Sequence, residues 1–506
     1  MLTRLKITGF KNLVDVDVRF GPFTCIAGAN GAGKSNLFDA IMFLSALADN
    51  PLFDAAKAVR DEGGRASDIR NLFHCVGENH AAKMTFEAEM IVPERGIDDL
   101  GQEAKAKITF LRYLLTIGFR TDSFSRSGGL ELLYEELSHI NLGTASQNIL
   151  FPHKTAAWRY SAVKGRRSGG AFISTHGEGK ERIIELHTDG EGGGRPRLIL
   201  SANMARTVLS TVNTAENPTA LMAKREMQSW RRLRLEPSAL RKPDELSAQT
   251  MLGADGSHLA ATLYNVARME SCSGSRSAVS ESANLRQSRI YAGLSARLAE
   301  FMDDAREITV DHDEKRELLT VMLSKEDGTQ HPARSLSDGT LRFLAIALLE
   351  LDRESTGLFC LEEPENGINP DRIRMLTDIL QEIAVDVCTP VGPDNPLRQV
   401  IINTHSPAVI AQVPDDSLLV AELSETMKDG LRFKSARFSC LPNTWRQTPQ
   451  ENISTIDRER LSSYRDPIQQ QAPEQHNKET RSKASGAPRR SDETVDQMQP
   501  NLPYGE

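Results

Sequence analysis

The segment Gly28-Ala-Asn-Gly-Ala-Gly-Lys34-Ser35 has the residue types and spacing of a phosphate-binding loop, G-x-x-x-x-G-K-[ST]. Its glycines allow backbone N–H groups to close around a phosphate, and Lys34 would neutralise the β and γ oxygens of a nucleotide. Ser35 would coordinate Mg²⁺, and the start of the following helix favours a bound anion. We therefore predict a site for ATP and Mg²⁺. The residues expected to contact the nucleotide are Asn30, Gly31, Ala32, Gly33, Lys34, Ser35 and Asn36.

A second set of candidate residues lies at the end of the apolar run 357–361, where Glu362 and Glu363 are adjacent. Such a strand places one acid beside Mg²⁺ and a second where it can polarise a water in line with the γ-phosphate. We predict that Glu362 and Ser35 bind the metal and that Glu363 is the general base. A solvated acidic turn is the alternative, and the phosphate loop in the same chain favours the catalytic interpretation.

A possible helix start lies shortly before this acidic strand. Residues 335–340, Ser-Leu-Ser-Asp-Gly-Thr, lead into an apolar segment at 341–351. A serine and a glycine at a helix N-terminus form an anion site, so Ser337 and Gly339 are candidate nucleotide ligands. Capping of the helix by Ser337 or Asp338 is a structural role that fits the same residues.

A histidine follows the next predicted strand along the chain. The run Gln399-Val-Ile-Ile-Asn403 is typical of a buried strand, and His405 comes two residues after it. A histidine there can hydrogen-bond a γ-phosphate or the attacking water, and we predict this catalytic role for His405. A structural histidine is the alternative, which its position one strand after the carboxylates disfavours.

Hydrophobic periodicity predicts the elements that must hold these residues. Residues 2–27 indicate three strands, and residues 36–47 indicate a helix directly after the phosphate loop. Further strands are predicted at 84–92, 106–120, 129–140, 308–310 and 318–323, and helices at 259–267 and 288–304. Asp327-Gly328 is typical of a hairpin turn.

Composition limits the classes of function. The 506 residues are 39% hydrophobic and 26% charged, as in globular proteins, and 61 basic against 69 acidic side chains leave a net charge of -8. Binding of nucleic acid by bulk charge is therefore disfavoured. Six scattered cysteines without a C-x-x-C pair indicate neither a disulfide framework nor a zinc site. With no signal peptide and no apolar run near about 18 residues, we expect a cytoplasmic protein without a membrane partner.

The order of these motifs resembles the ABC-type ATPase head shared by the SMC, RecF and OLD groups. LSDGT, at 336–340, stands where that class has LSGGQ, and His405 matches its switch histidine. The motifs ITGFKNL, GANGAGKSNLFDAI, GADGSHLAATL, SLSDGTLRFLAIALL, CLEEPENGINP and NTHSP more closely resemble stand-alone, OLD-related ATPases of the AAA family, several of which are subunits of anti-phage systems. The resemblance covers roughly residues 1–440.

The resemblance implies a P-loop NTPase of ABC/SMC-like type with a mixed sheet, a β-rich lobe and a helical insertion. It implies that Lys11, in the Phe-Lys-Asn turn, touches nucleotide, whereas a solvated lysine is the alternative. A Q-loop glutamine is not identifiable, and no TOPRIM nuclease motif follows His405.

This resemblance suggests five segments. Residues 1–50 and 306–440 would form the two parts of the ATPase head, 51–200 a β-rich lobe with an insertion, and 201–305 a helical insertion. Residues 441–506 would be a C-terminal extension. From about residue 465 it contains six Gln, five Pro and hardly any large apolar residue, so we expect it to be disordered.

The implied function is ATP hydrolysis by a head that dimerises around nucleotide, with Ser337 and Gly339 of one copy covering the γ-phosphate bound by Lys34 of another. The head would couple its state to DNA or to a partner effector, in anti-phage defence or DNA maintenance. The alternative is a non-motor scaffold that binds ATP persistently and sequesters or recruits a toxin or nuclease. A transporter subunit is a third, disfavoured class.

Two basic clusters are candidate contacts for DNA. One spans 153–167, and the other spans 224–242 and includes Arg231, Arg232 and Arg234. Binding to a phosphate backbone requires such a patch on an otherwise acidic chain. A solvated charged face is the equally ordinary interpretation of both clusters.

Overall fold

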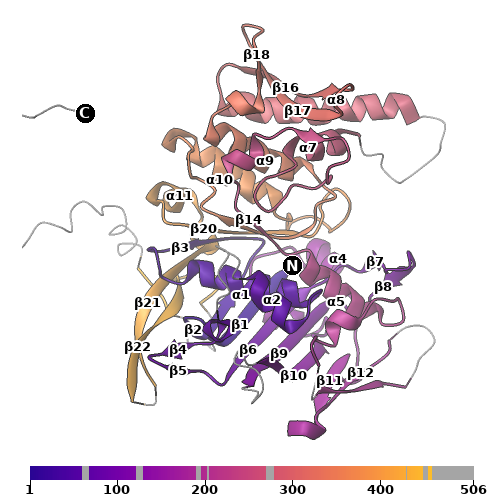
Figure 1. Cartoon of the computed structure of the whole chain (residues 1–506), viewed down its shortest axis with the longest axis vertical. Coiled ribbons are helices and arrows are strands. Elements are labelled where there is room, and N and C mark those ends of the chain that lie inside the picture. The colour runs from indigo at the N-terminus through magenta and orange to yellow at the C-terminus, as the bar shows by residue number, and fades with distance from the viewer. Residues whose placement is uncertain are drawn as a thin grey trace, which may run out of the picture. The chain divides into compact units, whose positions relative to one another are not determined.

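The computed structural model describes residues 1–59, 68–120, 129–189, 195–201, 204–268, 279–428, 430–447 and 454–457. These residues contain a six-stranded sheet, an eight-stranded antiparallel sheet, a smaller four-stranded sheet and two short hairpins (Figure 1). The predicted α/β class is confirmed, and the phosphate loop lies on the six-stranded sheet.

The six-stranded sheet positions the candidate site, with strand order β14-β19-β20-β3-β21-β22. Neighbouring strands are parallel except for the β21–β22 hairpin. Because parallel strands end at one edge, the segments after β3, β19 and β20 meet there, which is the usual ligand-binding edge of an open α/β sheet. The strands are β3 (Phe23–Ala27), β14 (Arg231–Leu233), β19 (Gly357–Glu362), β20 (Arg398–Thr404), β21 (Leu418–Lys428) and β22 (Leu431–Cys440).

Both faces of this sheet are buried, which explains why its strands are apolar throughout rather than alternating. In β19, Leu358 and Cys360 belong to the core shared with the eight-stranded sheet, whereas Phe359 and Leu361 belong to a second core on the opposite face. Helices α1 (Lys34–Leu47), α2 (Leu52–Ala58) and α5 (Pro218–Gln228) contribute to the first core. Helices α7 (Leu259–Arg268), α9 (Asp338–Leu351), α10 (Ile373–Ile383) and α11 (Pro407–Gln412) contribute to the second.

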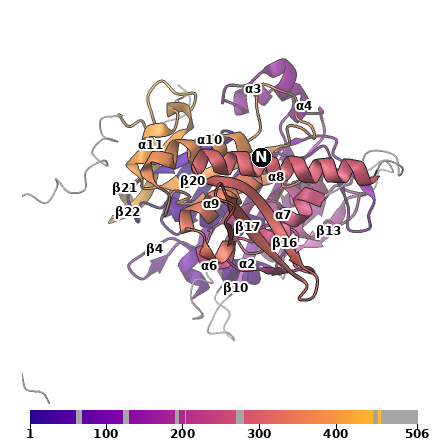
Figure 2. The same ribbon diagram turned by 90° about the horizontal axis from the view of Figure 1, so that it is seen from above.

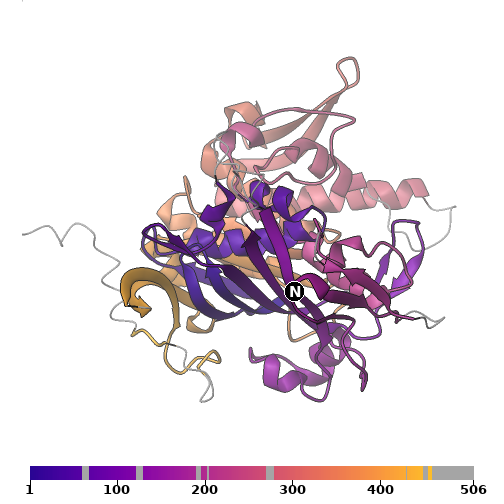
Figure 3. The same ribbon diagram turned by 60° about the horizontal axis from the view of Figure 1, so that its bottom comes forward.

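The eight-stranded sheet has the order β13-β12-β11-β10-β9-β6-β1-β2 and comes to the front in Figure 3. Its strands are β1 (Leu2–Phe10), β2 (Leu13–Arg19), β6 (Lys83–Ile91), β9 (Phe110–Arg120), β10 (Gly129–His139), β11 (Ile173–His176), β12 (Ile183–Leu186) and β13 (Arg197–Leu200). Two hairpins, β4 (Cys75–Val76) with β5 (Asn79–His80) and β7 (Arg95–Ile97) with β8 (Glu103–Lys105), and helices α3 (Ala145–Asn148) and α4 (Tyr160–Ala162) flank it.

A four-stranded sheet and the long helix α8 (Val279–Phe301) also contribute to the second core, and α8 packs against β16 (Figure 2). The sheet contains β15 (Asp244–Glu245), β16 (Ala305–Asp313), β17 (Leu318–Lys325) and β18 (Gln330–Pro332). The short helix α6 (Pro237–Leu240) packs against α9 and thereby connects this region to the head.

Most predicted elements are present, with shifted ends. The helix after the phosphate loop begins at Lys34 rather than at residue 36, and the turn at Asp327-Gly328 joins β17 to β18 as predicted. The segment 201–305 is not wholly helical, because β14 lies within it and pairs with β19 of the head. The predicted disordered tail from about residue 465 lies outside the described residues, and the five-segment division stays a prediction.

Candidate nucleotide-binding site

The phosphate loop connects β3 to α1 at the carboxyl edge of the six-stranded sheet. Gly31 and Gly33 have φ angles of 79° and 103°, which L side chains rarely adopt. A Cβ atom on Gly28 would collide with the carbonyl oxygen of Ala421, so the β21–β22 hairpin packs directly against the loop. The glycine pattern is therefore required both by the backbone conformation and by close packing.

Lys34 is 6% exposed, and its ammonium group donates to the carbonyl oxygens of Gly28 at 2.6 Å and Ala29 at 3.0 Å. Burial lowers the pKa of Lys34, although the nearby carboxylates of Glu363 and Glu365 act in the opposite direction. The ammonium is thus held across the loop, in the position where phosphate oxygens would approach it.

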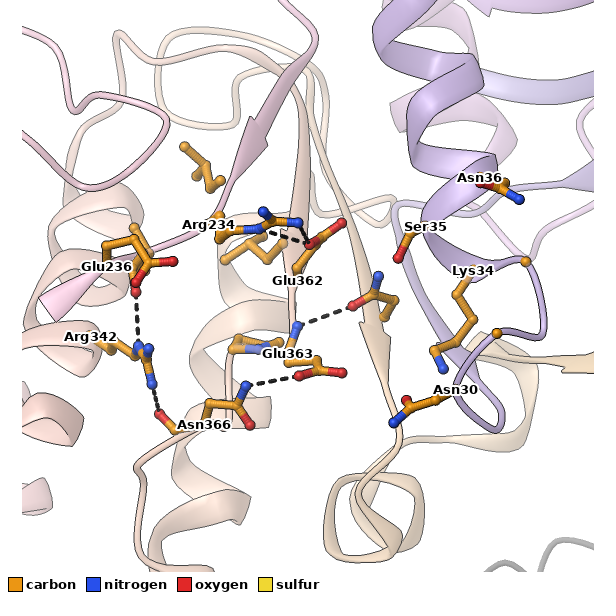
Figure 4. A pocket seen from close by; sticks show the side chains of 17 residues that line it. Asn30, Lys34, Ser35, Asn36, Arg234, Glu236, Arg342, Glu362, Glu363 and Asn366 are labelled. Carbon is orange, nitrogen blue, oxygen red and sulfur yellow. Dashed lines mark hydrogen bonds and ion pairs between the residues drawn. The ribbon is translucent and has the colours of Figure 1, made fainter. Parts of the chain in front are cut away.

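A pocket of about 400 Å³ lies between this loop and the ends of β14 and β19 (Figure 4). It brings together most of the predicted nucleotide, metal and catalytic residues. Those that line it are Asn30, Gly31, Gly33, Lys34, Ser35, Asn36, Glu362 and Glu363. Since the loop, the serine and both carboxylates face one cavity, its chemistry fits a nucleotide triphosphate with a divalent cation.

Glu363 has the environment expected of a base that must be ionised. Its Oε1 lies 2.9 Å from Nδ1 of His405, and its Oε2 accepts a hydrogen bond of 2.9 Å from the side-chain amide of Asn366. Burial would raise the pKa of Glu363, but these hydrogen bonds and the charges of His405 and Lys34 outweigh it, and the net pKa is lowered. The backbone is also constrained, because Glu363 has a φ angle of 43° and its N–H donates to Asn403.

His405 does not line the pocket but contacts it through Glu363, so its position supports orientation of the predicted base. The turn that carries it is held by Glu365, which is 7% exposed and accepts a hydrogen bond from the Thr404 hydroxyl. That hydroxyl also accepts from the Ser406 N–H at 2.9 Å. Burial raises the pKa of Glu365. The sequence analysis missed this buried glutamate.

Glu362 is held by two arginines from β14 and the residue after it. Arg232 and Arg234 donate to the two different carboxylate oxygens of Glu362, and Arg232 also donates to Asp39 at 2.8 Å. In the parallel pairing of β14 with β19, Arg232 lies beside Cys360 and Leu233 beside Leu361. Because alternate side chains of a strand point to the same face, Arg232 and Arg234 lie on the face of the sheet that carries Glu362. That face is the one covered by α1, where Asp39 lies one turn after Ser35.

This arrangement corrects the prediction that Arg231, Arg232 and Arg234 form a DNA-binding patch. Arg231 lies over the ring of Phe359 at 4.9 Å and donates to Ser355, while the other two are ion-paired with Glu362. The strand pairing of β14 turns these guanidinium groups toward the head. Arg231 and Arg232 are therefore partly covered, and Arg234 alone of the three is exposed, although it is ion-paired.

Four further predicted nucleotide contacts lie outside the pocket. Lys11 forms an ion pair with Asp39 and is 16% exposed, and the side chain of Ala32 is buried. Ser337 caps α9 by accepting from the Thr340 N–H at 3.1 Å, so the capping interpretation is confirmed. A Cβ on Gly339 would collide with the carbonyl oxygen of Gly367, which explains the need for glycine there.

The pocket also contains residues that were not predicted to contact nucleotide, metal or water. Arg342 on α9 donates to the carbonyl oxygens of Leu235, at 2.9 Å, and of Asn366. It thereby connects the segment after β14 to the segment after β19. The additional lining residues are Leu233, Arg234, Leu235, Glu236, Arg342, Leu361, Pro364, Asn366 and Asn403. A three-residue strand such as β14 has too little periodicity to be found from sequence.

The donor set at Ser35 and Glu362 suits Mg²⁺ better than a metal held by protein alone. Among the described residues there is no group of three or more His, Cys, Asp or Glu side chains that could hold a metal ion. Mg²⁺ is usually bound by one or two carboxylates together with substrate phosphates. A hydroxyl and a carboxylate on opposite sides of a phosphate-binding pocket fit that pattern.

Two family models match the chain. The model described as "AAA domain, putative AbiEii toxin, Type IV TA system" matches residues 273–411, and one described as "AAA domain" matches residues 4–88. The first match includes the α9 segment, both carboxylates and His405, and the second includes the phosphate loop.

A curated relative and solved structures add to these matches. The DNA replication and repair protein RecF of Phocaeicola vulgatus is 39% identical over 66 residues, which are 12% of this chain and 17% of that protein. The SMC head domain from Thermotoga maritima is 13% identical, with 87% of this chain and 98% of that chain covered and a TM-score of 0.35. An Smc head bound to the C-winged helix domain of ScpA is 14% identical, with 86% and 97% covered and a TM-score of 0.41.

The phosphate loop, the order of the six-stranded sheet and the two family matches together describe an α/β fold that is similar to nucleotide-binding AAA domains. The match to RecF spans about a sixth of that protein's length. Among the described residues, no helix is long and apolar enough to cross a membrane.

Proposed function

We propose that this chain binds ATP with Mg²⁺ and hydrolyses it to ADP and phosphate. The observation that carries the proposal is the position of Glu363, whose carboxylate is oriented by His405 and Asn366 at the wall of the pocket that contains Lys34. Mg²⁺, when bound, would offset negative charge on the phosphates. Lys34 would bind the phosphate oxygens, and Glu363 would accept a proton from the attacking water at its carboxylate.

The direct test is release of phosphate from ATP by the purified chain in the presence of Mg²⁺. Steady turnover supports a hydrolysing head. The scaffold alternative, in which ATP stays bound and recruits a toxin or nuclease, is favoured by one observation: two arginines pair with the predicted metal ligand, Glu362. A tightly bound nucleotide that is recovered as ATP after hours of incubation would support the scaffold.

We further propose that two heads close around nucleotide. Ser337 and Gly339 lie at the start of α9 but outside the pocket of their own chain, and Ser337 is exposed there, whereas Gly339 is buried against Gly367. The exposed start of α9 could therefore face a second copy. A symmetric pair of heads would place each α9 N-terminus against the phosphates bound by the other. Closure would exclude water and strengthen the charge interactions in both sites.

Replacing Ser337 with arginine should leave ATP binding by the phosphate loop intact but prevent closure and hydrolysis. Mixing this variant with Lys34→Ala protein, also inactive alone, should restore activity, because each mixed pair has one intact composite site. With random pairing of independent sites, the recovered activity would be about a quarter of wild type. Subunit exchange is verified with labelled chains, and Ser337→Thr, which keeps the helix cap, is the control. If the labelled chains exchange subunits but ATPase activity is not recovered, the model of two independent sites, each built from both copies, is contradicted.

For nucleic acid, we propose the basic segment 153–167 as the contact surface. No Asp or Glu occurs between Glu136 and Glu178, an unusual run in a chain of net charge -8. Lys154, Arg166 and the aromatic Tyr160 are exposed, and Tyr160 is 54% accessible. Exposed bases with an aromatic side chain suit a phosphate backbone with an adjacent base.

Charge reversal of Lys154, Lys164 and Arg166 should weaken DNA binding and flatten its dependence on salt, because each lost phosphate contact lowers the number of released counterions by about one. ATPase activity without DNA should persist. The control reverses Arg316, Arg353 and Arg374, which changes the net charge equally but affects arginines that are already ion-paired. Equal affinities and salt slopes for both triple variants would remove the segment 153–167 from the proposal.

A further inference from the structure

The two arginines that hold Glu362 differ in how firmly they are fixed. Arg232 is 20% exposed and lies between two acids, Glu362 and Asp39, and Asp39 also pairs with Lys11. Arg234 is 47% exposed, and its Nε and a terminal nitrogen lie 3.1 Å and 2.7 Å from Oε2 of Glu362. Arg232 therefore belongs to a buried charge network, whereas Arg234 stands at its solvent-facing end.

Arg234 also lines the pocket, where its guanidinium faces Glu362 across from the phosphate loop (Figure 4). Arg232 contacts the other oxygen of the same carboxylate, Oε1. Oε2 of Glu362 is therefore the carboxylate oxygen that the pocket-lining arginine holds. The planar guanidinium of arginine binds carboxylates and phosphates with the same two-pronged geometry.

We propose that Arg234 and Mg²⁺ compete for Oε2 of Glu362, and that Arg234 exchanges this carboxylate for a phosphate of the bound nucleotide when Mg²⁺ takes its place. The inference rests on the proposed function, because it concerns the same pocket. The exchange leaves no charge without a partner: the carboxylate passes from one cation to another, and the guanidinium passes from one anion to another. An unpaired charge in a partly buried site would be costly. Arg232 keeps Glu362 oriented throughout.

This exchange makes different predictions for nucleotide binding with and without metal. Without Mg²⁺, Arg234 stays paired with Glu362, so Arg234→Ala should bind ATP nearly as well as wild type does in chelator. At saturating Mg²⁺, Arg234 contacts a phosphate, so the same variant should bind ATP about tenfold more weakly than wild type, the scale of one charge-assisted hydrogen bond. The gain in ATP affinity that Mg²⁺ gives should therefore be about tenfold smaller in the variant.

The experiment measures the affinity for a fluorescent ATP analogue in chelator and across a series of Mg²⁺ concentrations. Glu362→Gln should lose most of the Mg²⁺ dependence while it keeps binding in chelator. Arg234→Lys, which retains the charge but not the fork, should lie between wild type and Arg234→Ala. Arg353→Ala is the matched control, because Arg353 is 56% exposed and pairs with Asp394 outside the pocket. Melting temperatures of all variants verify folding.

The inference is overturned if Arg234→Ala lowers ATP affinity by the same factor with and without Mg²⁺, which describes a simple phosphate ligand. It is equally overturned if Arg234→Ala and Arg353→Ala have the same ATP affinities both with and without Mg²⁺. Arg234 would then only form a structural ion pair with Glu362. Failure of the proposed function looks different: wild-type protein would then bind no ATP under any condition, or would bind it equally well after Lys34→Ala.

Discussion

Lys34→Ala is expected to abolish measurable ATP binding and turnover, with a loss of affinity of at least about 100-fold. The ammonium is the one side-chain cation that lies within the phosphate loop, where it is held by the carbonyl oxygens of Gly28 and Ala29. Hydrogen bonds to charged groups contribute about 1.5–3 kcal/mol each, and a lysine bridging two phosphates makes more than one. Calorimetric titration with ATP and a phosphate-release assay measure the two losses separately.

Lys11→Ala is the matched control for this variant. It also removes one lysine charge, but Lys11 pairs with Asp39 and lies outside the pocket. ATP binding should therefore survive it. If Lys11→Ala abolished binding while Lys34→Ala did not, the phosphate-loop assignment would fail, and the contact that the ABC-type resemblance implied for Lys11 would be supported.

Glu363→Gln is expected to retain ATP but to lower the rate of hydrolysis by about 10² to 10⁴, the usual contribution of a general base. A glutamine can still accept a hydrogen bond from Asn366 and hold a water, but it cannot take a proton. ATP should therefore accumulate on the protein, which single-turnover assays and analysis of the bound nucleotide detect. Slow hydrolysis by Glu362→Gln together with normal hydrolysis by Glu363→Gln would show that the roles of the two glutamates are reversed.

The pH dependence of stability and of hydrolysis provides a second test of the role of Glu363. The pKa of Glu363 is lowered from 4.5 in the structure, so the carboxylate is ionised at neutral pH. The stabilisation that it gives is present above the unfolded value of 4.5 and is lost as the pH falls through its lower folded value. Any decrease in hydrolysis between pH 7 and pH 5 must therefore come from a group other than Glu363.

The sequence predicted the local parts of the site because their information is local. A phosphate loop requires glycines at particular backbone angles, and Gly31 and Gly33 have those angles. Two apolar strands were also recognisable, one that leads to Glu362 and Glu363 and one that ends next to His405. Both were visible in the sequence because a strand buried on both faces is apolar throughout. The capping role of Ser337 likewise depends on residues within one turn of helix.

Contacts between distant segments required the tertiary structure. Glu362 and Arg234 are separated by 128 residues in sequence, and only the parallel pairing of β14 with β19 brings them together. The same pairing places Arg234, one of the three predicted DNA contacts, in the pocket wall. Charge alone does not indicate which way a side chain points, because the face of a strand is decided by register.

By itself, the sequence determined that this protein has an α/β fold with a phosphate loop, two adjacent acids and a histidine, because each is encoded in a short run of residues. The tertiary structure decided which of these groups share a cavity. It placed Ser337, Gly339 and Lys11 outside the pocket and brought Arg234, Glu236 and Arg342 into it. The reason is physical: residue type sets what chemistry a side chain can perform, whereas strand order and register set which side chains are close enough to perform it together.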